Sequence, residues 1–509
     1  MPSPKIENVT EEFQRFLGVQ QAQTFSAMDV TADAIARLLE RRGNISRLLE
    51  LWKEDYRSLL DVDSRDLPEI APAFKAFREA VTASLKVSTR RDGAPKTFKP
   101  YVTDLISSID VGKTFRELGR SVVEGLWRPD AAPELCADLK KQIESWEGQH
   151  PLAELLRRFC TERPLKGERA SGEANLTIAA SRDTELASWI ASVVHQDWRS
   201  WLMLSRDLSV DEQLETMNAL ICLHLHVAML WRLRDPSLPS IPPFFFTVVA
   251  AQQQESSCNR AAYNSFKFWR DRTEDGIKVV ARNLIRGAAE NDAELMNSLN
   301  TENWTKARLW AAIEIKERQR QTATNKFKTR VSQLIDERDE VSSRPAKDEV
   351  EELVVQALCE AFSGTSGPIE KTKDYLRNMG RGAGLVGPEG GFRRKRYQLD
   401  DMTLELLTRL HVSRDLETVR STETEKESVE AFLDDIFERY GIIITAEREM
   451  VDERIRSVRE HPPSPLGSIL AHLPSADAMA RNRVILDSRL DELRLVRRYS
   501  DASAVIHVS

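Results

Sequence analysis

Residues 209–235, SVDEQLETMNALICLHLHVAMLWRLRD, form the stretch from which the rest of the fold can be predicted. Ser209 followed by Glu212 is a capping box, in which the two side chains bond the free amide groups at the start of a helix. Pro236 ends the helix, because proline lacks the amide hydrogen and clashes with the preceding turn. Apolar side chains lie on every face in between, which predicts a helix buried on all sides. We expect it to be the central helix of a large helical domain.

The same stretch is not predicted to cross a membrane. Glu215, Asn218, His224 and His226 interrupt it, and its continuous apolar run is far shorter than the roughly 20 residues that a span needs. Residues 1–13 contain no apolar segment of the kind found in secretory signals. The five cysteines include no CxxC pair, which fits reduced thiols in a cytosol. The prediction is a cytoplasmic protein without membrane contact.

Length and composition favour a mainly helical protein of several domains. A chain of 509 residues is too long for one ordinary domain. With 21 glycines and 21 prolines, turn-forming residues are scarce for this length, which argues against a β-sandwich or a barrel. The net charge of −7 gives no overall signature of nucleic-acid binding, so any such binding must use local basic patches.

Helical spacing of apolar residues and two breaks predict three regions. An N-terminal helical region should cover 1–163, because the stretch 163–183 is poor in apolar residues and follows it. A central helical core domain should cover 184–363 and include one long helix from Trp304 to Glu340. Within it, 244–249 (FFFTVV) is the best strand candidate of the chain.

A smaller C-terminal domain of the α+β class is predicted for residues 366–509, after the breaker GTSGP. Its last part, 482–509, has the pattern of a helix, the strand RLVRRY, the polar turn SDAS and the strand AVIHV. Helix, strand, turn and strand is the ending of a winged-helix unit, in which the hairpin is the wing. The predicted fold is therefore mainly α, with a large multi-helix part and a winged-helix-like C-terminal domain.

Basic residues in this C-terminal part are the candidate DNA contacts. In a winged helix the recognition helix enters the major groove and the wing meets flanking phosphates. The alternative is a protein–protein module whose surface arginines are only solvated. The candidate DNA-binding residues are Arg393, Arg394, Lys395, Arg396, Arg483, Arg489, Arg497 and Arg498.

Two further motifs lack the context that their chemistry needs. Gly382, Gly384 and Gly387 match G-x-G-x-x-G, but a helical pattern precedes them and a proline follows, so we expect a flexible loop without a dinucleotide. Cys222, His224 and His226 alternate on a predicted helix, where side chains two positions apart point about 200° apart and cannot converge on a metal ion. We predict no catalytic residue, no metal and no cofactor.

A metal-dependent nuclease remains an alternative. Glu314-Ile315-Lys316 resembles the E-x-K end of a restriction-type nuclease core, and Asp138-Leu139-Lys140 matches the related D-x-K form. Such a core needs carboxylates on adjacent strands that hold a divalent ion beside the lysine. Both triplets lie in stretches with helical patterns, so the required context is not predicted for either.

Three passages resemble large helical accessory proteins of bacterial anti-phage or mobile-element systems. They are ICLHLHVAMLWRL with PPFFFTVVAAQQQ, GAGLVGPEGGFRRKRYQLDDMTLELL, and AFLDDIFERYGIII. Such proteins accompany separate ATPase or nuclease subunits, so the resemblance implies protein partners and supplies no catalytic residues. The expected function is a non-enzymatic scaffold or adaptor subunit of a bacterial complex that acts on DNA, with DNA contact through the C-terminal domain. A pure protein–protein adaptor, without nucleic acid, is the remaining alternative.

Overall fold

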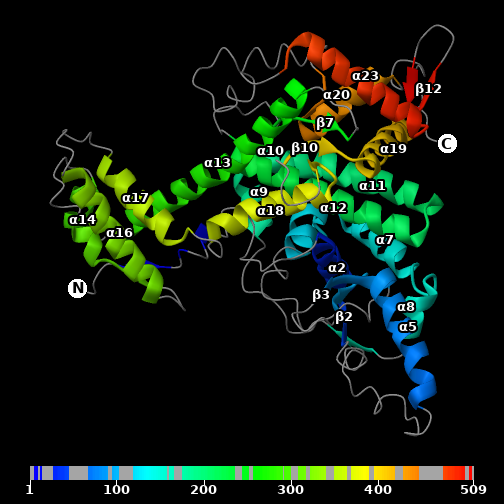
Figure 1. Ribbon diagram of the computed structural model, residues 1–509, viewed down its shortest axis with the longest axis horizontal. Coiled ribbons are helices and arrows are strands. Elements are labelled where there is room, and N and C mark those ends of the chain that lie inside the picture. Colours follow the sequence, from blue (N-terminus) through cyan, green and yellow to red (C-terminus); the bar gives the residue numbers. More distant parts are fainter. Residues whose placement is uncertain are drawn as a thin grey trace. The chain divides into compact units, whose positions relative to one another are not determined.

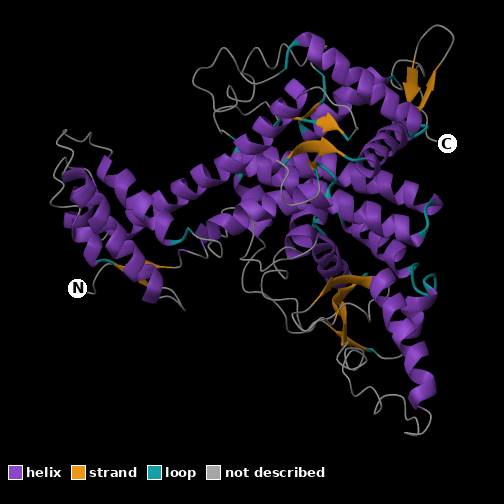
Figure 2. Ribbon diagram, in the orientation of Figure 1, coloured by secondary structure: helices purple, strands orange, loops and turns teal. Residues whose placement is uncertain are grey.

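The computed structural model confirms a mainly helical chain with few, short strands (Figure 2). The structure describes part of the chain, and everything below concerns that part. The described residues are 5–7, 9, 12–13, 27–44, 67–89, 95–101, 119–157, 160–164, 175–234, 243–250, 256–290, 292–299, 308–316, 321–339, 349–363, 368–388, 395–418, 428–445, 474–498 and 504–506.

Contacts between residues divide the chain into two compact units, each made of separate segments. The smaller unit combines residues 1–22 with 269–376, and the larger combines 23–268 with 377–509. This division follows different boundaries from the three predicted consecutive regions. The physical reason is long-range strand pairing, which joins the N-terminus to the middle of the chain and the middle to the C-terminal part.

The smaller unit has its own apolar core. Strand β1 (Lys5–Glu7) pairs in parallel with β8 (Glu314–Lys316), and helix α16 (Gln321–Asp339) packs against α17 (Glu349–Ala361). The core contains an apolar stripe of α16, which is buried. The stripe consists of Phe327, Val331, Leu334 and Ile335. Helix α14 (Ala293–Leu299) and the 3-10 helix η5 (Arg308–Ala312) complete this unit.

The prediction of one long helix from Trp304 to Glu340 is wrong. The structure instead has η5, then strand β8, and then α16 from Gln321. Ile315 lies opposite Ile6 of β1, and both side chains are buried in the core of the smaller unit. Pairing and packing against a cross-strand neighbour override the local helical pattern here. The sequence around Ile315 does not reveal this neighbour, because Ile6 is distant along the chain.

Helix α12 (Val210–Leu233) is at the centre of the larger unit (Figure 1). The predicted capping box of Ser209 and Glu212 is present, and the backbone is extended at Arg234, two residues before Pro236. Among the described residues α12 is the one helix long and apolar enough to cross a membrane, but 83% of its most apolar window is buried in the protein. This burial confirms the predicted core helix and is compatible with a soluble protein.

The larger unit contains further helices. Among them are α10 (Thr184–Trp189), the π-helical η3 (Ile190–Val194) and α11 (His195–Leu204), which follow one another directly. The others are α2 (Ala27–Leu38), α5 (Leu67–Leu85), η2 (Ser121–Trp127), α7 (Pro133–Glu144), α8 (Pro151–Arg157), α9 (Asn175–Arg182), η4 (Ser205–Asp207), α19 (Asp401–Thr418), α20 (Val429–Tyr440) and α23 (Ala476–Glu492). Of these helices, α2, η2 and α19 contact α12. Helices α13 (Ser256–Ala289) and α18 (Pro368–Gly382) each run from one unit into the other.

The predicted strand at 244–249 is confirmed and is divided in two. Strand β6 (Phe245–Phe246) pairs in parallel with β11 (Ile442–Ile443). Strand β7 (Val248–Val249) pairs in parallel with β10 (Arg396–Leu399), which also pairs with β9 (Val386–Gly387). These partners all come from the C-terminal part of the chain, which therefore shares one unit with the central helix. Two further antiparallel pairs join β2 (Arg41–Asn44) to β5 (Thr161–Pro164) and β3 (Lys86–Thr89) to β4 (Pro95–Phe98).

The chain ends in the predicted order of helix, strand and strand. After α23, strands β12 (Val496–Arg498) and β13 (Ala504–Ile506) form an antiparallel hairpin. Leu495 and Ile506 are buried where the hairpin meets α20 and α23. Among the described residues the hairpin is a separate sheet of two strands. Strands β10 and β11 of the C-terminal part pair instead with β7 and β6.

Candidate functional site

A group of buried polar side chains in the larger unit surrounds one carboxylate, Asp197 of α11. We call it the Asp197 cluster. Its members come from four helices that are far apart in sequence and meet at the centre of the unit. They are Asp197 of α11, His224 of α12, Arg414 of α19, and Arg439 and Tyr440 of α20.

Each of the two oxygens of the Asp197 carboxylate accepts two hydrogen bonds. Oδ1 accepts from Nη1 of Arg414 at 2.7 Å and from Nη2 of Arg439 at 2.5 Å. Oδ2 lies 2.9 Å from Nε2 of His224 and accepts from the Tyr440 hydroxyl at 2.7 Å. Four donors therefore occupy this acceptor, which is the full capacity of a carboxylate.

A second carboxylate balances the charge of the cluster. Asp435 accepts from Nη2 of Arg414 and lies 3.1 Å from Nδ1 of His411. Its other oxygen lies 4.0 Å from Nε of Arg439. Two carboxylates thus face two guanidinium groups, so the charges of the cluster balance. An unbalanced charge is strongly disfavoured in a protein interior.

The surroundings fix the protonation state of the cluster. Burial by itself would raise the pKa of Asp197, but Arg439, the bond from His224 and Arg414 outweigh it and hold this pKa well below the usual range. Burial lowers the pKa of His224, against the opposing effect of Asp197. Burial also raises the pKa of Tyr440. At neutral pH the cluster therefore contains an ionised Asp197, a neutral imidazole and a protonated phenol.

This arrangement can hold helices together, but it offers no reactive group to a substrate. Asp197 and His224 have no exposed side-chain surface, and Arg414 retains 6%. Trp189 and Trp198 lie edge-on to the His224 ring, with ring centroids at 6.1 and 6.0 Å. A carboxylate whose four lone-pair positions are filled and which solvent cannot reach cannot act as a base or bind a metal ion. We conclude that the Asp197 cluster joins α11, α12, α19 and α20.

Sequence reasoning missed this cluster because its partners are distant along the chain. Arg414 and Arg439 are 217 and 242 residues from Asp197. The structure places the two histidines of the motif Cys222, His224 and His226 against different neighbours. His226 Nε2 lies 3.1 Å from the Tyr397 hydroxyl, whereas His224 faces Asp197.

The glycine motif is part of the packed interior, and the prediction of a flexible loop is wrong. Gly382 ends α18, and a methyl group placed there would lie 2.4 Å from Cβ of Ala27 and 2.6 Å from Sγ of Cys222. Gly384 has a φ of +64° and precedes strand β9. The order is thus helix before strand, the reverse of a dinucleotide-binding motif. These glycines allow close approach of backbones.

The E-x-K triplet lies on a strand, contrary to the predicted helix. Glu314 of β8 forms an ion pair with Lys5 of β1 at 3.3 Å, and Glu7 is opposite Lys316 in the strand register. Asp138, by contrast, lies exposed on α7 as predicted for a helix. Among the described residues no group of three His, Cys, Asp or Glu side chains could hold a metal ion. The strand context is therefore present for Glu314, but the additional acidic ligands are not found in the described part.

The candidate DNA-binding residues are distributed between internal ion pairs and the surface. Arg483 bonds Glu430 at 2.5 Å and Asp487 at 2.9 Å, and Arg489 bonds Asp401 at 2.7 Å. These two arginines attach α23 to α20 and α19. The other candidates lie as follows: Lys395 donates to the carbonyl of Pro388, Arg396 is half-buried in β10, Arg497 is exposed on β12, and Arg393, Arg394 and the side chain of Arg498 lie outside the described residues.

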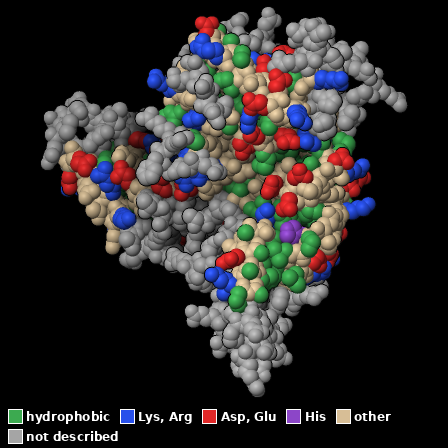
Figure 3. Space-filling model, turned by 45° about the vertical axis from the view of Figure 1, so that its right-hand side comes forward, with side chains coloured by type: hydrophobic (Ala, Val, Ile, Leu, Met, Phe, Trp, Pro, Cys, Tyr) green, Lys and Arg blue, Asp and Glu red, His purple; other side chains and the backbone are tan. Residues whose placement is uncertain are grey.

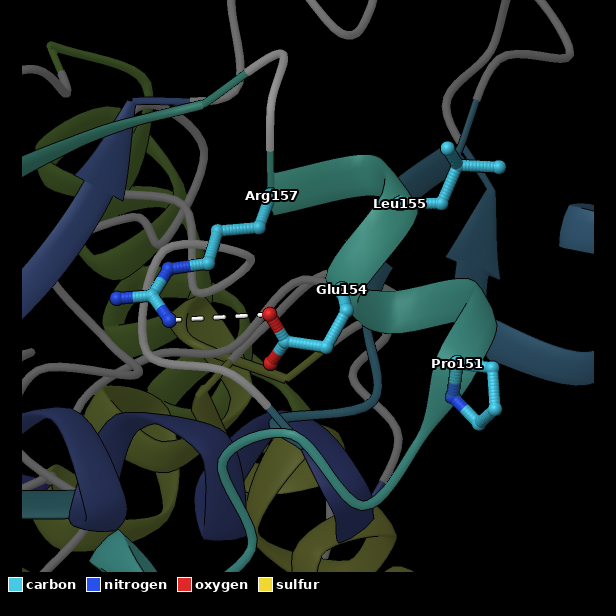
Figure 4. Close-up of a pocket in the computed structure, with 4 residues that line it drawn as sticks. All are labelled: Pro151, Glu154, Leu155 and Arg157. Carbon is cyan, nitrogen blue, oxygen red and sulfur yellow. Dashed lines mark ion pairs between the residues drawn. The ribbon is translucent and has the colours of Figure 1, made fainter.

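A surface pocket of about 390 Å³ lies at helix α8 (Figure 4). Pro151, Glu154, Leu155 and Arg157 line it. The guanidinium of Arg157 points toward Glu154 at 3.8 Å, whereas Leu155 points away from this pair. The pocket is open to solvent, and its lining residues include no pair of a nucleophile and a base.

Charges of both signs are interleaved among the described residues of the face shown in Figure 3. On the face shown in Figure 3 the lysine and arginine side chains alternate with acidic ones and form no continuous basic area among the described residues. Hydrophobic side chains gather in the lower part of this face, around a histidine.

Comparisons with known protein families, curated proteins and solved structures found no match to this chain.

Proposed function

We propose that the chain is a non-enzymatic scaffold or adaptor subunit that acts through its surfaces within a larger protein complex. The observation that carries this proposal is the closed Asp197 cluster. It gathers the residue types of an active site, yet every acceptor of its carboxylate is occupied and the group is sealed from solvent. Its role is to hold helices, which leaves the molecular surface for partners.

The outward face of α23 supports a protein partner more than the phosphate backbone of DNA. The exposed acids on this helix are Asp477, Asp491 and Glu492, against one exposed arginine, Arg481. Val484, in the middle of this face, is 67% exposed. Glu492 forms an ion pair with Arg489, and the two other exposed carboxylates outnumber the one exposed arginine, so this face disfavours phosphates. Protein–protein interfaces have an apolar core and a polar rim, and the exposed Val484 between polar residues has this arrangement.

Purification of the chain from its own cells, followed by cross-linking and mass spectrometry, tests the proposal. We expect cross-links to other proteins that map to exposed residues of the described units. A reagent that joins carboxylates to lysines should label Asp477 or Glu492 on α23. Cross-links confined to the chain itself would contradict the proposed role.

Contact with DNA through the C-terminal hairpin is a second candidate. The observation that favours it is the exposure of Arg494 and Arg497, which lie where α23 passes into β12. If these residues meet phosphates, the double variant Arg494→Glu/Arg497→Glu should weaken duplex binding at least tenfold. It should also reduce the dependence of log Kd on log salt concentration by about two, one for each lost contact.

The matched control for this experiment is Arg206→Glu, an exposed arginine on η4 in the same unit. Binding should be measured at two salt concentrations in the full-length chain, since removal of the C-terminal part would also remove partners of β6, β7 and Asp197. If the double variant and the control bind DNA equally, the hairpin makes no DNA contact and the adaptor function stands alone.

A further inference from the structure

His150 caps the short helix α8 through one ring nitrogen. Its Nδ1 accepts a hydrogen bond from the backbone N–H of Ala153 at 3.2 Å. This is the geometry of an N-cap, in which a side-chain acceptor satisfies one of the free amides in the first helical turn. Because an acceptor needs a lone pair, Nδ1 carries no proton in this arrangement.

The same imidazole connects α8 to the start of the central helix. The His150 ring stacks on the Tyr101 ring, with centroids 4.5 Å apart and planes 12° apart. Tyr101 is buried and its hydroxyl donates to Asp211 in the first turn of α12. His150 therefore supports α8 by a hydrogen bond on one side and by an aromatic contact on the other.

Charged groups lie around this contact, and most of them are paired. Asp211 accepts from Tyr101 and lies 3.6 Å from Nζ of Lys99, which also lies 5.7 Å from the Tyr101 ring centroid. On α8, Glu154 accepts from the backbone of Gly148 at 2.9 Å and lies 3.8 Å from Arg157. Arg157 also pairs with Glu147. Burial, Asp211 and Glu215 together raise the pKa of the Tyr101 hydroxyl, so Glu215 of α12 is a further carboxylate near this contact.

We propose that His150 is an acid-sensitive cap, which holds α8 and its pocket in place at neutral pH and releases them when the imidazole is protonated. A proton on Nδ1 turns the acceptor into a donor that faces the N–H of Ala153. It also places a positive charge at a helix N-terminus, where the helix dipole disfavours it. The residues that line the pocket belong to the segment that would be released.

Hydrogen exchange of the full-length chain at pH 5.5 and 7.5, corrected for intrinsic rates, tests this proposal. The peptide covering 147–157 should lose protection about fivefold or more at the lower pH, while peptides from α12 keep theirs. In His150→Asn the loss should be absent. Asparagine is a good N-cap that offers the same kind of acceptor and does not titrate.

Two results would overturn the proposal. One is equal protection of 147–157 at both pH values in the wild-type chain, and the other is an equal loss of protection in His150→Asn, which would assign the effect to another group. Nitrogen NMR of the imidazole gives a measurement that needs no variant. An unprotonated Nδ1 is expected at pH 7.5, and a protonated Nδ1 at that pH contradicts the cap.

Discussion

Replacement of Asp197 by asparagine should lower the free energy of unfolding of the larger unit by about 3–5 kcal/mol. The substitution leaves Arg414 and Arg439 buried with one carboxylate between them, and the asparagine amide group brings an additional donor toward their N–H groups. An uncompensated buried charge is among the most destabilising changes in a protein. Denaturant unfolding followed by tryptophan fluorescence measures the effect, since Trp198 is buried beside His224.

The matched control is Asp138→Asn, the same chemical change at an exposed position of α7. It should leave stability unchanged, because it breaks no buried interaction. The effect should also depend on pH. Because the folded chain holds the pKa of Asp197 below its value in the unfolded chain, the carboxylate stabilises the fold above about pH 4 and loses this contribution as pH falls toward the lowered pKa. Equal stability of wild-type chain and Asp197→Asn at pH 7 would contradict the assigned role.

Replacement of Gly441 by alanine should have a comparable effect, more than about 3 kcal/mol, for a reason of backbone geometry. Gly441 ends α20 with a φ of +70°, and its carbonyl accepts from the N–H of Phe245 at 2.9 Å. A methyl group there would lie 1.9 Å from the carbonyl oxygen of Pro243, which is backbone and cannot move aside like a flexible side chain. The pairing of β6 with β11 would have to separate.

Gly148→Ala isolates the part of this effect that comes from φ alone. Gly148 has a φ of +81°, but a methyl group there would meet nothing within 4 Å. This variant should therefore cost only the left-handed conformation, about 1–2 kcal/mol. Thermal or denaturant unfolding of both variants gives the comparison. If both variants lose the same free energy of unfolding, the close approach at Pro243 does not contribute to the effect of Gly441→Ala.

Local signals were sufficient to predict the central helix and the strand at 244–249. The capping box, the later proline and the apolar residues on all faces act within one segment, and the structure places α12 in the core accordingly. The stretch at 314–316 shows where such reasoning ends. Its strand forms because Ile315 pairs with Ile6, about three hundred positions earlier in the chain. No pattern in the local sequence indicates this pairing.

The same distance effect explains the outcome for the candidate residues. An arginine near the C-terminus has the same letters around it whether it faces DNA or an internal acid. Arg489 bonds Asp401 from 88 positions away, and Arg483 bonds Glu430 from 53. The sequence shows the charges but not their pairing, so it favoured a binding face where the fold uses two of the arginines to attach α23.

The mass and composition of the particle that contains this chain test the central claim most directly. The chain should be purified under native conditions from its own cells and measured by light scattering with mass spectrometry of the components. We predict a stable particle well above the 57.9 kDa of one chain, with other proteins in fixed ratio. Recovery of this chain alone, with no other protein bound, would contradict the account.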